Sequence, residues 1–193
     1  MAMTDAQLLK RAREGDGDAF SQLFARHERA VFRYAAYMCG HEAGDDIVQE
    51  TFLAVLRQSS RRDVPNGTVR AYLIGIARHR VLKRLTSRGA RMEGESLDGD
   101  GGPEIDAVDP TALDRLVDAE RVAAVRAAVQ ALPPVFREAL VLCDLQELAY
   151  ADAAAVLKCP IGTVKSRLSR ARALLAAALS AYQPPNRARG TTP

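Results

Sequence analysis

The sequence predicts an all-α protein made of two small helical domains joined by a flexible acidic linker. Three observations carry this prediction: apolar residues recur at spacings of three, four and seven, no segment alternates like a β-strand, and charge is partitioned along the chain. The 193 residues include 27 Lys and Arg against 24 Asp and Glu, and 48% of the residues are apolar. This length and composition suit one domain or two small ones with buried cores.

Four helices are expected in the first domain, residues 1–88. Thr4 is a suitable N-cap for the first helix, and Asp45 and Asp46 place negative charge where the third helix begins. Pro65, Asn66 and Gly67 break the chain before the fourth helix. The expected helices run from Thr4 to Gly15, from Asp16 or Asp18 to Gly40, from Gly44 past Leu56, and from about Thr68 to Ser87.

A change of composition separates the two domains. Residues 89–111 are rich in Gly, Asp, Glu and Pro and are too polar to order on their own, which predicts a flexible linker. Between Glu93 and Glu120 there are ten acids and one base, whereas the flanks 1–92 and 121–193 each hold six more bases than acids. Basic clusters without intervening acids are typical of nucleic-acid binding, because solvated helix faces usually interleave the two charges.

The second domain, residues 112–182, is expected to hold four helices followed by a disordered tail over residues 183–193. The helices are expected from about Thr111 to Leu132, from Val135 to Gln146, from Ala149 to Leu157, and from Pro160 to about Ala181. Only Lys158 and Cys159 separate the last two helices before Pro160, and such a short connection predicts a helix-turn-helix.

The last helix has one apolar face and one polar face. The spacing assigns six residues to the core: Ile161, Val164, Leu168, Ala171, Leu175 and Ala178. The opposite face holds five residues, of which four are small or hydroxyl-bearing: Gly162, Thr163, Ser166, Ser169 and Arg170. Lys165 and Arg172 flank that face on one side, and Arg167 flanks it on the other. Small side chains allow a helix to approach base edges in the major groove while Lys and Arg reach phosphates. The alternative is a basic helix that packs on its own domain.

Three segments carry a resemblance to a known family. Residues 132–175 read LPPVFREALVLCDLQELAYADAAAVLKCPIGTVKSRLSRARALL and resemble region 4 of the extracytoplasmic-function sigma factors of the sigma-70 family. Residues 15–35, GDGDAFSQLFARHERAVFRYA, and 45–57, DDIVQETFLAVLR, resemble region 2. The resemblance covers about residues 5–88 and 112–180. It implies a bacterial alternative sigma factor that binds core RNA polymerase and promoter DNA and directs transcription initiation in a stress or envelope response.

The resemblance also implies a role for individual residues. Region 4 would read the −35 element with Thr163, Lys165, Ser166, Arg167 and Arg170. Region 2 would read and melt the −10 element with Arg70, Tyr72, Arg78, His79, Arg80, Lys83 and Arg84. Most relatives carry Trp, Asn and an acid where Tyr72, His79 and Lys83 stand, which bears on base capture and promoter choice. Asp46, Gln49 and Glu50 would bind core polymerase, and the family's partners there are the β′ clamp helices and the β subunit. The alternative is that these residues are only the acidic start of an ordinary helix.

Other classes of function find little support. The sequence has no Walker A motif, no GxGxxG motif and no catalytic triad, so we expect neither enzymatic activity nor a cofactor. Cys39, His41 and His27 make a poor zinc site, and with Cys143 and Cys159 the cysteines are too few and scattered for a disulfide framework. Because the sequence has no long apolar segment, the chain is not expected to enter a membrane. The resemblance implies a location in the cytoplasm at the nucleoid and control by an anti-sigma factor, which is itself often at the membrane.

Two further interpretations stay open. The chain could be a sigma-like mimic that sequesters an anti-sigma factor, although a decoy has no need of Lys165 or Arg170. It could be a plain helix-turn-helix regulator, although residues 45–57 would then have no role. The acidic linker either lies in the channel that RNA later occupies or serves as a soluble tether.

Overall fold

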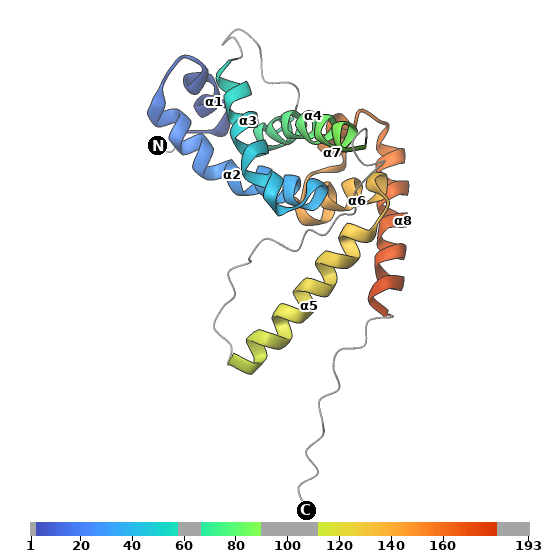
Figure 1. Ribbon diagram of the computed structural model, residues 1–193. Helices are drawn as coiled ribbons and strands as arrows, with labels where there is room; N and C mark the ends of the chain where they lie inside the picture. The colour runs from blue at the N-terminus through green and yellow to red at the C-terminus, as the bar shows by residue number, and fades with distance from the viewer. Residues whose placement is uncertain (1–2, 58–66, 90–111, 181–193) are drawn as a thin grey trace, which may run out of the picture.

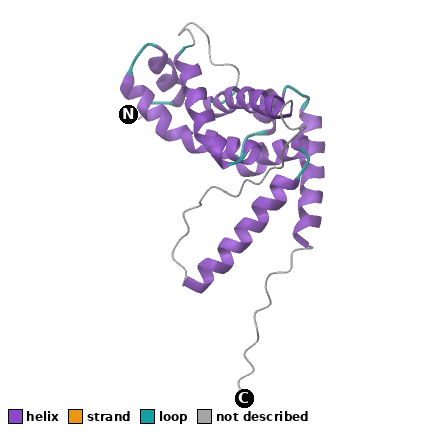
Figure 2. Ribbon diagram, viewed as in Figure 1, coloured by secondary structure: helices purple, strands orange, loops and turns teal. Residues whose placement is uncertain are grey.

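The computed structural model describes residues 3–57, 67–89 and 112–180, and every regular element in these ranges is helical (Figure 1, Figure 2). The all-α prediction is therefore confirmed, while the predicted tail and nearly all of the predicted linker lie outside the described residues. The N-terminal group consists of α1 (Asp5–Arg13), α2 (Gly17–Cys39), the 3-10 turn η1 (His41–Ala43), α3 (Gly44–Leu56) and α4 (Val69–Gly89). The C-terminal group consists of α5 (Ala112–Ala131), α6 (Pro134–Leu140), the π-helical turn η2 (Val141–Leu145), α7 (Tyr150–Leu157) and α8 (Ile161–Ser180).

The helix boundaries follow local capping chemistry. Thr4 caps α1 in a capping box, in which its hydroxyl accepts from the backbone N–H of Gln7 and the Gln7 side chain accepts from the Thr4 N–H at 2.9 Å. Asp16 caps α2 by accepting from the N–H of Ala19 at 3.0 Å. Gly40, at φ 88°, ends α2 in a conformation that favours glycine. The expected boundaries of the first two helices are confirmed.

Helix α2 is the centre of the N-terminal group and packs against α1, α3 and α4. Its apolar stripe includes Leu23 and Val31, which are fully buried. Phe52 of α3 is also buried and lies with its ring centroid 4.8 Å from that of Phe24 and 6.0 Å from that of Phe20. These apolar contacts hold α3 against α2, and α3 and α4 also pack against each other, so the two helices present a shared surface to solvent.

The C-terminal group is built around α8. Its buried face contains Val164, Leu168 and Ala171, which pack toward α6 and α7, and Lys158, at φ 53°, makes the left-handed turn between α7 and α8. The helix-turn-helix is thus confirmed. The prediction that Ile161 and Ala178 belong to the core is wrong, because both are exposed where α8 extends beyond the helices that cover its middle.

The two groups pack against each other. Helix α7 lies against α4, and α6 and η2 lie against α2, so that one continuous set of buried apolar residues spans both groups (Figure 1). Helices α5 and α8 project from this shared body. A flexible linker between the domains, as expected from the composition of residues 89–111, does not predict this direct contact. In the described ranges, every helix is too short or too polar to cross a lipid bilayer.

Candidate functional site

Helix α8 presents the predicted −35 residues on its solvent side. The buried stripe of Val164, Leu168 and Ala171 fixes the rotation of the helix about its own axis. The predicted residues are consequently turned outward, with three exposed and two half-buried: Lys165, Ser166 and Arg170 are exposed, and Thr163 and Arg167 are half-buried. Cations and hydroxyls on one exposed helix face provide phosphate contacts and hydrogen-bonding groups for base edges.

Neighbouring helices orient the cations of α8. The Lys165 ammonium lies 5.7 Å from the ring centroid of Tyr150, the first residue of α7. Arg172 donates two hydrogen bonds to Asp144 of η2, at 2.9 and 2.7 Å, and these bonds raise the pKa of Arg172 above its usual range. Arg172 is thereby tied to the body of the group. Lys165 and Arg170 remain on the exposed face.

A second charged surface lies where α3 and α4 meet. Asp46, Gln49 and Glu50 are all exposed on α3. Asp46 accepts from Arg84 at 3.1 Å, and Glu50 lies 3.5 Å from Arg80, so each predicted polymerase-binding acid is paired with a predicted −10 residue of α4. The acids and the bases therefore form one continuous surface of mixed charge. Exposed pairs of this kind contribute little to folding stability, which leaves their side chains available for a partner.

The remaining predicted −10 residues divide into two sets. His79 and Lys83 are exposed. Arg70, Tyr72 and Arg78 are half-buried and already have protein partners. The Tyr72 hydroxyl accepts from Arg13 of α1 at 2.7 Å, and the Arg13 guanidinium lies 5.3 Å from the ring centroid. Tyr72 and His79 line a cleft of about 670 Å³ between α4 and α7. The structure thus brings the α4 residues together along one helix without exposing all of them.

Arg70 and Arg78 are bound by the C-terminal group. Arg78 donates to both oxygens of Glu138, at 2.9 and 3.3 Å, and Arg70 donates to the Gln146 side chain at 2.7 Å. The hydroxyl of Tyr34 donates to the same Glu138 at 2.7 Å. Glu138, Gln146 and Tyr34 therefore belong to this site, although none of them was predicted from the sequence. Glu138 follows Arg137 and Gln146 precedes Glu147, so neither stands out in the sequence as an isolated polar residue.

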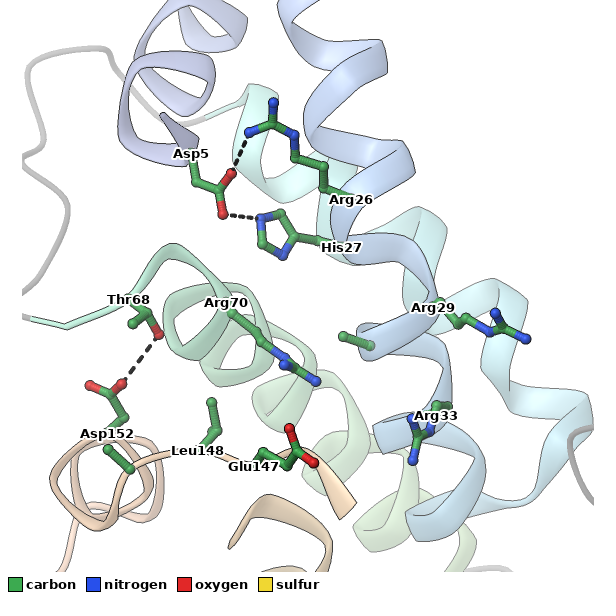
Figure 3. A pocket seen from close by; sticks show the side chains of 12 residues that line it. Asp5, Arg26, His27, Arg29, Arg33, Thr68, Arg70, Glu147, Leu148 and Asp152 are labelled. Carbon is green, nitrogen blue, oxygen red and sulfur yellow. Dashed lines mark hydrogen bonds and ion pairs between the residues drawn. The ribbon is translucent and has the colours of Figure 1, made fainter. Parts of the chain in front are cut away.

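A cavity of about 630 Å³ lies between α2, α4 and the segment before α7 (Figure 3). At one end Asp5 accepts from Arg26 and contacts the His27 ring, each at 2.8 Å. Burial lowers the pKa of His27, and this effect outweighs the opposite influence of Asp5. Burial also lowers the pKa of Arg70, and the charge of nearby Arg33 adds to that shift. Of the cavity's arginines, Arg26 is paired with Asp5, whereas Arg70 donates to the side-chain oxygen of Gln146 and Arg33 donates to the carbonyl oxygen of Leu145.

The residues considered for a zinc site each have separate surroundings. The Cys39 thiol lies 4.0 Å from the carbonyl oxygen of Val81, His27 contacts Asp5, and the His41 ring packs edge-on against Phe32. Over the ranges that the structure describes, His, Cys, Asp and Glu side chains form no cluster of three suited to a metal ion.

Two family models match the two groups of helices. Sigma-70 region 2 matches residues 23–91, and sigma-70 region 4 matches residues 123–175. The chain is 37% identical over 178 residues to the ECF RNA polymerase sigma factor SigC of Mycobacterium tuberculosis, covering 86% of both proteins. It is 30% identical over 181 residues to the ECF RNA polymerase sigma-E factor of Haemophilus influenzae, covering 90% of this chain and 94% of that protein.

Solved structures share the arrangement of helices. CnrH, in complex with the cytosolic domain of CnrY, matches with a TM-score of 0.65 and 28% identity, over 93% of this chain and 99% of CnrH. The sigma factor RpoE of Bartonella quintana, in complex with the anti-sigma factor NepR, matches in fold with a TM-score of 0.69 and 24% identity, over 85% of this chain and 98% of RpoE.

Proposed function

The chain belongs to the sigma-70 family, among its extracytoplasmic-function sigma factors, and from this membership we propose that it binds core RNA polymerase and directs it to specific promoters. One observation carries the proposal. A single chain combines an outward-facing basic helix in a helix-turn-helix with a separate mixed-charge surface on α3 and α4. A plain helix-turn-helix regulator has use for the first surface only.

The two surfaces have different tasks in this proposal. Helix α8 enters the major groove at the −35 element, where Ser166 and Arg170 reach base edges and Lys165 contacts phosphate. Helix α4 follows the −10 element with Arg80, Lys83 and other cations, which suit a single-stranded backbone as well as a duplex. The cleft beside Tyr72 and His79 offers stacking and hydrogen bonding to an unstacked base.

The exposed face of α3 is the proposed contact with core polymerase. Asp46, Gln49 and Glu50 occupy one helical turn and present two carboxylates and an amide to a partner. The pairs with Arg80 and Arg84 can exchange for intermolecular pairs at small cost, because all four side chains are near the surface. Nucleotide chemistry belongs to the polymerase in this scheme, and the chain acts in the cytoplasm, where polymerase and chromosome meet.

Control by an anti-sigma factor is part of the proposal. CnrH was solved with a cytosolic protein domain bound, and RpoE, which shares the fold, was solved with an anti-sigma factor bound. A partner that clasps the two groups of helices in contact would cover the promoter-reading surfaces of both.

Run-off transcription with purified core polymerase and genomic fragments tests the function. We expect Arg170→Ala to lose promoter recognition while still joining the polymerase, and Gln49→Ala to weaken polymerase association. Arg121→Ala and Gln130→Ala are matched controls, since they make the same chemical changes at exposed positions of α5. Absence of both promoter-dependent transcripts and a polymerase complex with the unmodified chain contradicts the proposal.

A further inference from the structure

The cavity between α2, α4 and the segment before α7 is not explained by the proposed function, which uses only Arg70 among its lining residues. Its volume of about 630 Å³ is typical of pockets that hold small ligands. The lowered pKa of His27 leaves the buried ring neutral near pH 7, so arginines are the cations of the cavity. Four arginines and three acids line it: Arg26, Arg29, Arg33 and Arg70, with Asp5, Glu147 and Asp152.

Two of these arginines are hydrogen-bonded to neutral groups instead of acids. Arg33 donates to the carbonyl oxygen of Leu145 at 3.0 Å, and Arg70 donates to the side-chain oxygen of Gln146 at 2.7 Å. A guanidinium group has five N–H donors, and the buried Nε of Arg70 has no hydrogen-bond partner among the residues that the structure describes. Arg33 and Arg70 therefore keep both positive charge and donor capacity at the cavity wall.

The two guanidinium groups are close enough to repel each other. Burial lowers the pKa of Arg70 and the charge of Arg33 lowers it further, while the carboxylate of Glu147 opposes this shift less strongly. Figure 3 shows Arg70 extending from α4 toward α2, the helix of Arg33, with Glu147 at the edge of the same space. Glu147 is exposed, so its side chain can turn out to solvent. An anion in the cavity would neutralise the two arginines more completely than Glu147 does.

The shape of the cavity wall suits several linked phosphates. Arg26, Arg29 and Arg33 recur at three and four residues, so they share one face of α2 over about 10 Å. Thr68 and Ala149, which precede α4 and α7, also line the cavity, and helix N-termini add partial positive charge to that of the arginines. Arginine forms two-pronged hydrogen bonds with phosphate. Among the described residues that line the cavity, none is Phe, Tyr or Trp, so a nucleobase would have no such ring to stack on.

We propose that this cavity is a binding site for a small oligophosphate anion, with a diphosphate group held between Arg33 of α2 and Arg70 of α4. The bound phosphates take the place of Glu147 as the counter-charge of the two guanidinium groups. The inference goes beyond the proposed function, and its test needs neither polymerase nor DNA. Because Arg70 is also a predicted −10 residue, the anion and promoter DNA would compete for it, and only this consequence rests on the proposed function.

Isothermal titration calorimetry of the full chain with sodium pyrophosphate, at fixed ionic strength, tests the site. Arg33→Gln removes a cation of the site and should weaken binding about tenfold. Glu147→Gln removes a competing carboxylate from an exposed position and should strengthen binding about threefold. Arg121→Gln on α5 and Glu42→Gln in η1 make the same chemical changes at exposed positions away from the cavity, and both should bind like the unmodified chain. If Arg33→Gln does not fold, Glu147→Gln still decides.

We expect one pyrophosphate to bind per chain. ADP carries a diphosphate group on a nucleoside and should bind no more tightly than pyrophosphate, because the cavity lining offers its base no Phe, Tyr or Trp ring.

The proposal is overturned if pyrophosphate does not bind, if folded Arg33→Gln binds it as tightly as the unmodified chain, or if Glu147→Gln does not strengthen binding. Several equivalent pyrophosphates per chain would indicate general attraction to a basic protein and would also overturn it. ADP that binds about tenfold more tightly than pyrophosphate contradicts recognition through the phosphates. These outcomes do not depend on transcription, so a failure of the proposed function leaves them unchanged.

Discussion

Replacing Gly44 with alanine tests how tightly α2 and α3 pack beneath the proposed polymerase contact. Gly44 is the first residue of α3 and has helical backbone angles, so its conformation alone does not require glycine. A Cβ atom at this position would collide with the Phe32 ring of α2, with ring carbon Cδ2 at 2.7 Å. The glycine is required because the ring approaches the helix so closely.

The magnitude follows from two opposing terms. Alanine gains about 0.5 to 1 kcal/mol over glycine in a helix, whereas forcing an extra methyl group into a packed contact costs about 1 to 3 kcal/mol. The difference runs from about 0 to about 2.5 kcal/mol. From its middle we expect Gly44→Ala to lose about 1 kcal/mol of unfolding free energy, or about 2 to 4 °C in Tm for a chain of this size. Gly75→Ala in α4 is the matched control, since its Cβ meets no atom within 4 Å and the change should raise Tm slightly.

Thermal unfolding followed by circular dichroism measures both changes. The double variant Gly44→Ala with Phe32→Leu identifies the cause, because a smaller side chain at position 32 relieves the collision and the two losses should be less than additive. Equal Tm values for Gly44→Ala and Gly75→Ala, or strictly additive losses in the double variant, would refute the packing argument.

Two other predictions concern pH and salt. The pKa of His27 is lowered below its usual value of 6.5, so the unfolded chain binds a proton that the folded chain disfavours, and stability should fall as the pH drops from above 6.5 through the lower folded pKa. The pKa of Asp5 is lowered, because hydrogen bonds and charge from Arg26 and His27 outweigh the effect of its burial, so the contribution of Asp5 to stability is lost only below about pH 3.8. His27→Gln should therefore make the melting temperature nearly independent of pH between about pH 5 and 7.5. A pH profile of the melting temperature that the substitution leaves unchanged contradicts this prediction. Lys165→Ala should weaken holoenzyme binding to all promoters alike and reduce the slope of log affinity against log salt by about 1, measured by fluorescence anisotropy, and an unchanged slope would show that Lys165 makes no phosphate contact.

The helices were predictable because their signals are local. Thr4, Asp16 and Gly40 act on backbone groups within a few residues, and the spacing of apolar residues in α2 and α8 needs no distant partner. Apolar spacing also predicts that Ile161 is buried, but the side chain is exposed because no neighbouring helix covers it. Periodicity records which face of a helix is apolar, and only packing decides how far that face is covered.

The candidate site was predictable only in part, for a related reason. Clustered charge singles out Arg70 and Arg78 as cations suited to a polyanion, and the structure shows them on one helix. Their partners Glu138 and Gln146 are 60 and 76 residues away. Each has a charged neighbour in the sequence, Arg137 and Glu147, so neither stands out as a distant partner. Docking of the two groups is a tertiary event across a polar linker, and no local pattern specifies it.

Footprinting of a cognate promoter by the reconstituted holoenzyme tests the central claim most directly. Two separately folded surfaces of one chain, on α4 and α8, must contact one promoter at two places while the chain is bound to core polymerase. We therefore expect protection over both the −10 and −35 elements that requires the polymerase, and loss of this protection in Arg170→Ala. Protection of a single segment, or of both segments by the chain without polymerase, would contradict the account.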